Sequence, residues 1–236
     1  MESYESLLKR TAYQQENLLI DDSDFTPSDG LREKVNVENA LKPFYGDTTV
    51  FDLDEAVKES ITSIQKKLYS LNEECFCVRL ASSTLHMTLH DLSASPSLEG
   101  VRKQMADNEA ALLRKREESP LPCQTIRMKT NYVCDSVKTS LVLNLLPENA
   151  EEWLKLASLY EWVDEIRPLK RDLYPHITLA YYNYYGFSGE ALKKLKKTVL
   201  ELNQTHFDLT LYTSKLYYQR FTDMNTYRNV FPLVKR

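Results

Sequence analysis

Residues 85–92 read LHMTLHDL, and residues 175–182 read PHITLAYY. Both stretches contain the pattern His-x-Thr-Leu, and the two copies use two of the four histidines in a chain of 236 residues. The sequence has seventeen threonines, so chance alone supplies about 0.3 His-x-Thr triplets. The repeated pattern therefore indicates a fold with two related halves.

The spacing of the pattern predicts where its side chains point. Successive side chains of a β-strand alternate between the two faces of the sheet, so His86 and Thr88 share one face. His176 and Thr178 share one face in the same way, and the apolar residues between and beside them take the other. Each copy is thus predicted to be a strand with one face in the core and one polar face.

The rest of the sequence alternates segments of strand and helix character. Apolar residues recur at spacings of three and four in the helical segments and at a spacing of two in the strands. Helices are predicted over residues 5–19, 54–72, 97–118, 148–166 and 188–202, and strands over 48–53, 75–92 with a break at 81–83, 125–146 with a turn at 135–138, and 206–218.

This order of elements predicts an α+β fold. Two similar lobes that each contain a β-α-β unit would place antiparallel or mixed sheets on either side of a central groove. Residues 1–43 are polar and are expected to form a partly helical N-terminal extension. Residues 44–236 are expected to form the main domain, with lobes of about 44–120 and 121–236 that are free to exchange elements.

Composition limits the class of protein. The chain is 42% hydrophobic and 27% charged, which is typical of a globular protein, and no apolar run has the length of a signal sequence or a membrane span. We therefore expect a cytoplasmic monomer with no stable protein partner. A net charge of −4 argues against broad, nonspecific binding to nucleic acid. The four cysteines are expected to be reduced core thiols: Cys75, Cys77, Cys123 and Cys134.

Two facing imidazoles suggest a chemistry. The ordinary pKa of histidine lies near 6.5, so one ring can act as a base while its partner acts as an acid. If the two strands lie side by side, His86 and His176 suit an in-line displacement at phosphorus, with the Thr88 and Thr178 hydroxyls as donors to the phosphate oxygens. This scheme needs no metal and no cofactor. The alternative is that both histidines are structural and hydrogen-bonded within a half-buried sheet.

Leu85-His86-Met87-Thr88-Leu89 and Pro175-His176-Ile177-Thr178-Leu179 resemble the signature of the two-histidine (2H) phosphoesterases, a superfamily of LigT-like and cyclic-phosphodiesterase-like proteins. The opening FYGDTTVFDL (residues 44–53) looks closest to a poorly characterised branch. The resemblance implies a bilobal fold and metal-independent hydrolysis of a phosphodiester, commonly a 2′,3′-cyclic phosphate at a nucleotide or RNA end. It implies His86 and His176 as catalytic residues and Thr88 and Thr178 as phosphate-binding ones.

Three further residues are candidate substrate contacts. Tyr182 is predicted to share the face of His176 and to offer a ring for base stacking. Arg171 precedes the second motif and could meet a phosphate, and His90 is expected at the rim of the groove. A metal site at His86 and His90 is disfavoured, because four residues of strand span about 13 Å. Two other functions stay open: a binding module for nucleotides or RNA ends without turnover, and an oligonucleotide-trimming phosphodiesterase.

Overall fold

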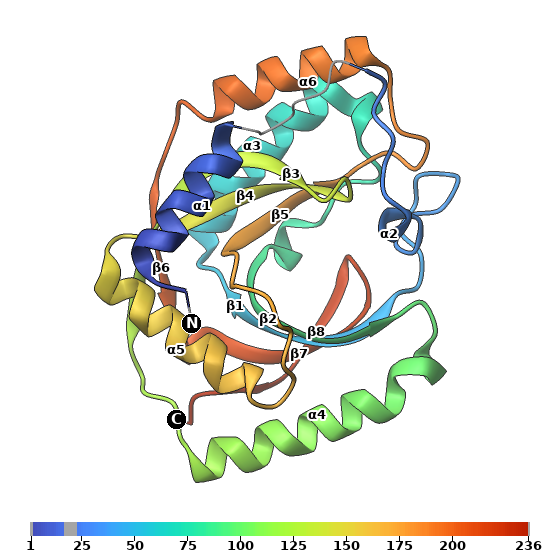
Figure 1. The fold of residues 1–236 in the computed structure, drawn as a ribbon. Coiled ribbons are helices and arrows are strands. Elements are labelled where there is room, and N and C mark those ends of the chain that lie inside the picture. Colours follow the sequence, from blue (N-terminus) through green and yellow to red (C-terminus); the bar gives the residue numbers. More distant parts are fainter. Residues whose placement is uncertain (1, 17–22, 236) are drawn as a thin grey trace.

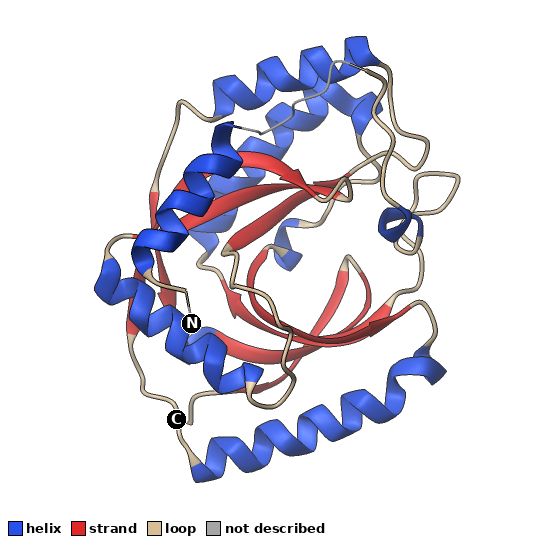
Figure 2. Ribbon diagram, in the orientation of Figure 1, coloured by secondary structure: helices blue, strands red, loops and turns tan. Residues whose placement is uncertain are grey.

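The computed structural model describes residues 2–16 and 23–235, and it confirms the α+β fold (Figures 1 and 2). Eight strands form one curled sheet in the order β6-β3-β4-β5-β2-β1-β7-β8, and every neighbouring pair is antiparallel. The strands are β1 (Tyr45–Asp52), β2 (His86–Ser95), β3 (Thr125–Ser136), β4 (Ser140–Pro147), β5 (His176–Tyr181), β6 (Asp208–Tyr212), β7 (Leu216–Asp223) and β8 (Thr226–Pro232).

Helices cover the outer faces of the curled sheet (Figure 1). The long helix α4 packs against β1 and β2, whereas α3 and α6 pack against each other over β5 and β3. The helices are α1 (Tyr4–Glu16), α2 (Asp29–Arg32), α3 (Glu55–Asn72), α4 (Leu98–Glu118), α5 (Ala150–Asp164) and α6 (Gly189–Leu202). None of the helices in the described ranges has the length and apolarity needed to cross a membrane.

The sheet has two halves that meet at a single residue pair. The first half-sheet contains β2, β1, β7 and β8, and the second contains β6, β3, β4 and β5. Met87 of β2 pairs with Ile177 of β5, and this pair sets the antiparallel register between the two halves. The two His-x-Thr strands are therefore neighbours at the junction of the two halves.

The lobes do not follow the predicted division at residue 120. Strands β7 and β8 come from the end of the chain but complete the first half-sheet beside β1, and α3 follows β1 but packs on the second half. The exchange of elements is thus extensive. As a result, β2 pairs with one edge of β1 and β7 pairs with the other.

The buried face of α3 is partly polar. Leu71 is 40% exposed, whereas Gln65 and Asn72 are buried. Gln65 donates to the Leu179 carbonyl at 2.8 Å, and Asn72 donates to Thr198 of α6 at 3.0 Å. The amide nitrogens of these two polar side chains thus make hydrogen bonds across the helix–sheet and helix–helix contacts.

The N-terminal extension is part of the core. Leu7 of α1 is fully buried, and the Trp153 indole of α5 donates to the Glu2 carbonyl at 3.0 Å. Leu31 and Val35 are also fully buried. The predicted end of the first helix, at Leu19, lies outside the described residues.

Two strand predictions need correction. Residues 75–80 form no strand: a 3₁₀ turn over Glu73–Cys75 leads into one isolated bridge from Phe76 to Tyr182. The segment 206–218 is divided by a 3₁₀ turn at Thr213–Lys215, which separates β6 from β7. The edge strand β8 escaped prediction because its residues are mostly exposed and lack apolar alternation.

The cysteines are free thiols, as expected. Cys75, Cys77 and Cys134 are buried, and burial raises the pKa of each to about 12. Cys123 is exposed and is not a core residue, because it lies in the extended link between α4 and β3.

Candidate active site

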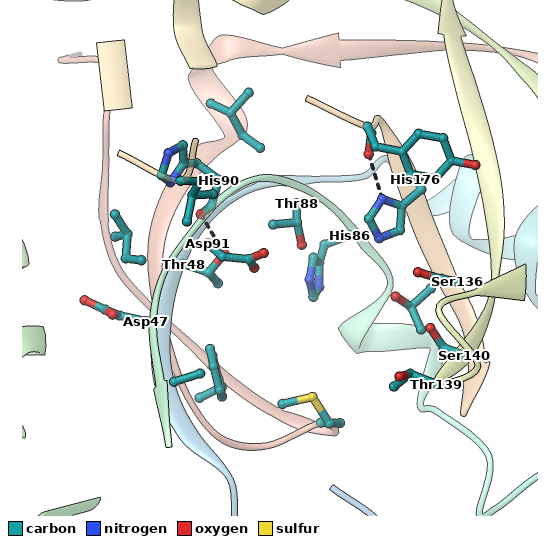
Figure 3. Close-up of a pocket in the computed structure, with 18 of the residues that line it drawn as sticks. Asp47, Thr48, His86, Thr88, His90, Asp91, Ser136, Thr139, Ser140 and His176 are labelled. Atoms are coloured by element: carbon teal, nitrogen blue, oxygen red, sulfur yellow. Dashed lines mark hydrogen bonds between the residues drawn. The ribbon is translucent and has the colours of Figure 1, made fainter. Parts of the chain in front are cut away.

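The two His-x-Thr motifs line one cavity of about 570 Å³ (Figure 3). Extending the antiparallel register by one residue on each side of Met87 and Ile177 sets His86 opposite Thr178, and Thr88 opposite His176. Directly opposed side chains lie about 4.5–5.5 Å apart at Cβ, and diagonal ones about 7–8 Å. The two imidazoles are thus diagonal neighbours on the same face.

Burial follows the predicted alternation through both motifs. Leu85, Met87 and Leu89 are buried, whereas His86 and Thr88 are partly exposed. The same alternation runs from residue 175 to residue 179. Each strand thus places its apolar residues in the core and its histidine and threonine toward the cavity.

The two imidazoles are anchored in the same way. Nδ1 of His86 lies 2.7 Å from the Thr84 carbonyl oxygen, and Nδ1 of His176 lies 2.7 Å from the Tyr174 carbonyl oxygen. A carbonyl only accepts, so Nδ1 carries the proton in both rings. Nε2 of each neutral ring is therefore left as the acceptor that can exchange a proton with a ligand.

The protein environment disfavours the protonated form of both rings. Burial lowers the pKa of His86 to about 4, and the charge of His176 acts in the same direction. Burial also lowers the pKa of His176, and the positive charge of Arg171 contributes. An anion between the rings would raise both values, because opposite charge favours the protonated form.

Each motif strand contains a β-bulge at the leucine of its motif. The register of β2 against β1 passes from Thr88 directly to His90, which leaves Leu89 as the extra residue. The register of β5 against β4 shows the same irregularity, with Leu179 as the extra residue. A bulge shifts the alternation by one, so residues beyond it point to the face opposite to the one expected.

The bulge on β2 moves His90 away from the predicted rim position. Its side chain is fully buried, and its Nε2 lies 2.9 Å from an Asp164 carboxylate oxygen at the end of α5. The ring also packs against Tyr160, with centroids 4.9 Å apart. His90 therefore connects β2 to α5, and Asp91 takes the cavity-facing position.

The bulge on β5 has the same effect on Tyr182. This residue is fully buried and packs against Phe25, Phe76 and Phe187, so it does not share the face of His176. Tyr181 lines the cavity in its place. The prediction that Tyr182 shares the face of His176 is therefore wrong.

Arg171 lies at the cavity. Its guanidinium is largely exposed and forms an ion pair with Asp91 across the groove, from the segment before β5 to strand β2. The Asp91 carboxylate acts on both catalytic candidates, because it raises the pKa of His86 and of His176. Asp91 was not among the predicted site residues.

Other cavity residues also escaped prediction. Lys34 of the N-terminal extension lines the wall. Hydroxyl-bearing residues around the β3–β4 turn also line it (Figure 3). No local pattern signals them, since they reach the site only through the tertiary fold. The turn residues are Ser136, Thr139 and Ser140.

Asp47 lies beside the cavity as a buried carboxylate. It accepts hydrogen bonds from Ser93, from Asn108 of α4 and from the Tyr218 hydroxyl at 2.9 Å. These donors satisfy the charge and tie α4 to the first half-sheet. Within residues 2–16 and 23–235, no three or more His, Cys, Asp or Glu side chains gather as a metal site would require.

Comparison with known proteins shows a shared fold. No protein-family model and no curated protein matches the sequence. The crystal structure of a conserved protein of unknown function from Agrobacterium tumefaciens matches with a TM-score of 0.69 and 16% identity, over 88% of this chain and 94% of that one. The bilobal arrangement is therefore a fold that solved proteins already show.

Structures of Escherichia coli LigT also match. The apo form has a TM-score of 0.46 and 18% identity, over 81% of this chain and 99% of LigT. The complex of LigT with 3′-AMP has a TM-score of 0.47 and 17% identity, over 80% of this chain and 96% of LigT.

Proposed function

We propose that this chain is a two-histidine phosphoesterase that hydrolyses a phosphodiester without a metal ion. The preferred substrate is a 2′,3′-cyclic phosphate at a nucleotide or RNA end. One observation carries the proposal: the two His-x-Thr strands pair at Met87 and Ile177, so that both histidines and both threonines line one cavity. Two structural histidines would have no reason to face a shared cavity from separate half-sheets.

The anchoring of the rings supports the division of labour. With Nδ1 of each ring held by a carbonyl, Nε2 of one ring takes a proton from the attacking water. Nε2 of the other ring, protonated because the phosphate anion raises its pKa, donates to the leaving ribose oxygen. Thr88 and Thr178 donate hydrogen bonds to the non-bridging oxygens and stabilise the charge that develops there.

The cavity suits a substrate of nucleotide size. Its volume of about 570 Å³ falls within the range of small-molecule sites. Arg171 at the groove adds a cation, and Tyr181 adds an aromatic ring. Both features favour a phosphate ester that carries an aromatic base.

Hydrolysis of 2′,3′-cyclic nucleotides in the presence of a chelator tests the proposal. The parent is compared with His86→Ala and His176→Ala, and His206→Ala is the matched control, because His206 is exposed and does not line the cavity. Each cavity variant should lose about 10²–10⁴-fold in kcat, while the control keeps the parent rate.

Other outcomes assign the other functions. Retained ligand binding with no turnover in the parent would identify a binding module, and activity that the chelator abolishes would identify a metal-dependent reaction. Cleavage of linear oligonucleotides in preference to cyclic phosphates would identify a trimming phosphodiesterase.

A further inference from the structure

Lys34 reaches the cavity from a rigid part of the N-terminal extension. Its backbone N–H donates to the Leu31 carbonyl at 2.8 Å, and its carbonyl accepts from the Lys42 N–H at 2.8 Å. Leu31 and Val35, on either side of it, are fully buried in the core. The backbone of Lys34 is thus fixed, and its side chain lines the cavity wall.

The ammonium group of Lys34 lies among aromatic rings. Its Nζ is 5.3 Å from the centroid of Phe44 and 5.5 Å from that of Tyr181. Among the described residues it has no ion-pair or hydrogen-bond partner, whereas Arg171, the other cation that lines the cavity, is paired with Asp91. Burial lowers the pKa of Lys34, and the charges of Asp91 and Glu33 oppose this effect without contacting it.

An aromatic row separates this ammonium from the first histidine. The Tyr227 ring lies 4.8 Å from His86 and 5.5 Å from Phe221, and Phe221 stacks at 6.2 Å on Phe44. Lys34 lies at the far end of this row. The cavity therefore has a catalytic end with two imidazoles and a distant end with one cation that has no anionic partner.

We propose that Lys34 binds a second phosphate group of the substrate, in addition to the phosphodiester held between His86 and His176. The inference rests on the proposed function and narrows it to nucleotides with two phosphate groups. A partly buried cation over aromatic faces lacks the carboxylate that usually compensates such a charge. A substrate phosphate would supply that compensation, and the rings between the two phosphate positions would contact the base and the ribose.

The second phosphate has two chemical sources. A mononucleotide carries it at the 5′ position, and an RNA end carries it as the last internucleotide linkage. Both present an anion on the other side of the ribose from the 2′ and 3′ oxygens. Binding measurements with unreactive probes can distinguish these sources without relying on turnover.

The experiment compares dissociation constants by calorimetry. The probes are adenosine 3′-monophosphate, adenosine 3′,5′-bisphosphate, and an adenylyl dinucleotide that ends in a 3′-phosphate. The parent should bind the bisphosphate, the dinucleotide or both at least about tenfold more tightly than the monophosphate, the gain expected from a charge-assisted hydrogen bond. Tighter binding of the bisphosphate would identify a 5′-phosphate as the second phosphate group. Tighter binding of the dinucleotide would identify the internucleotide linkage.

Variants assign the preference to this lysine. Lys34→Gln should abolish the preference while binding of the monophosphate stays within about twofold of the parent, and Lys34→Arg should retain it. Lys66→Gln is the matched control, because Lys66 is exposed on α3, does not line the cavity and carries the same charge. It should behave as the parent does.

Two results would overturn the inference: equal affinity of the parent for all three probes, or a preference that Lys34→Gln retains. A preference lost in Lys34→Gln, together with no hydrolysis of cyclic phosphates, would instead remove the proposed function and leave Lys34 as a ligand-binding residue. Hydrolysis of cyclic phosphates without tighter binding of the probes that carry two phosphate groups would exclude the role of Lys34 and leave the proposed function in place.

Discussion

Asp91 and Tyr181 occupy equivalent positions on the two motif strands. Each lies five residues after the histidine of its motif, beyond a bulge at the motif leucine, and each lines the cavity. The two half-sheets thus repeat the bulge as well as the His-x-Thr pair. The two strands therefore share a backbone conformation but present different side chains to the cavity, a carboxylate on one strand and a phenol ring on the other.

Asp91→Asn is expected to shift the pH profile of kcat/KM to lower pH. The Asp91 carboxylate raises the pKa of both histidines, and its loss also leaves the Arg171 charge, which lowers the pKa of His176, without a partner. The pKa values of His86 and His176 should therefore both fall further in this variant. Asp172→Asn is the control, because Asp172 also lines the cavity but does not perturb either histidine. An unchanged profile in Asp91→Asn would contradict the electrostatic role.

Tyr181 and Tyr182 should respond to substitution in opposite ways. Tyr182→Ala removes a fully buried ring and should cost about 3–5 kcal/mol of unfolding free energy while KM stays at the parent value. Tyr181→Leu should raise KM about tenfold, because it removes an aromatic ring that lines the cavity. Urea denaturation and steady-state kinetics on both variants measure the two effects. A higher KM in the Tyr182 variant alone would contradict the assignment of Tyr181 as the ring that contacts the substrate.

The free energy of unfolding should decrease as the pH is lowered from about 6.5 to about 4, because the folded protein resists protonation of His86. Its pKa is about 4 in the folded protein and about 6.5 in an unfolded chain, so the unfolded state binds more protons between these values. The contribution of His86 to the free energy of unfolding is fully present above about pH 6.5. It declines toward pH 4 by up to about 1.4 kcal/mol per pH unit. Denaturation of the ligand-free protein at several pH values should give a flatter dependence for His86→Gln. His206→Gln, at an exposed histidine outside the cavity, is the control.

Tyr218→Phe should destabilise the first half-sheet. The Tyr218 hydroxyl donates to the buried Asp47 carboxylate at 2.9 Å, and a hydrogen bond to a charged group contributes about 1.5–3 kcal/mol. Tyr217→Phe, the same change at the preceding residue of β7, is the control. The Tyr217 hydroxyl makes no hydrogen bond to the described residues. Equal urea midpoints for the two variants would show that Ser93 and Asn108 satisfy Asp47 without help.

Local patterns predicted the parts of this fold that depend on neighbouring residues. The predicted helix over 97–118 matches α4 to within one residue, and Ser188 caps α6 by accepting from the Ala191 N–H. The alternation around His86 and His176 also holds through each motif. These features follow from periodicity and capping, which a short window of sequence contains.

Contacts between distant segments decided the rest. A bulge depends on the register with the neighbouring strand, so nothing within residues 85–92 shows that His90 is turned away and Asp91 toward the cavity. Lys34 reaches the site only because the extension folds into the core. The β7–β8 hairpin is partly exposed, and its place beside β1 is fixed by pairing across more than 160 residues.

The position of β1 between β2 and β7 has a consequence for synthesis on the ribosome. Residues 45–52 emerge before residues 216–223, the strand that covers their second edge. Until then the nascent chain carries an open edge of backbone donors and acceptors, a feature that invites pairing with other polypeptides. A product that terminates before residue 216 keeps that edge permanently and should accumulate as an aggregate.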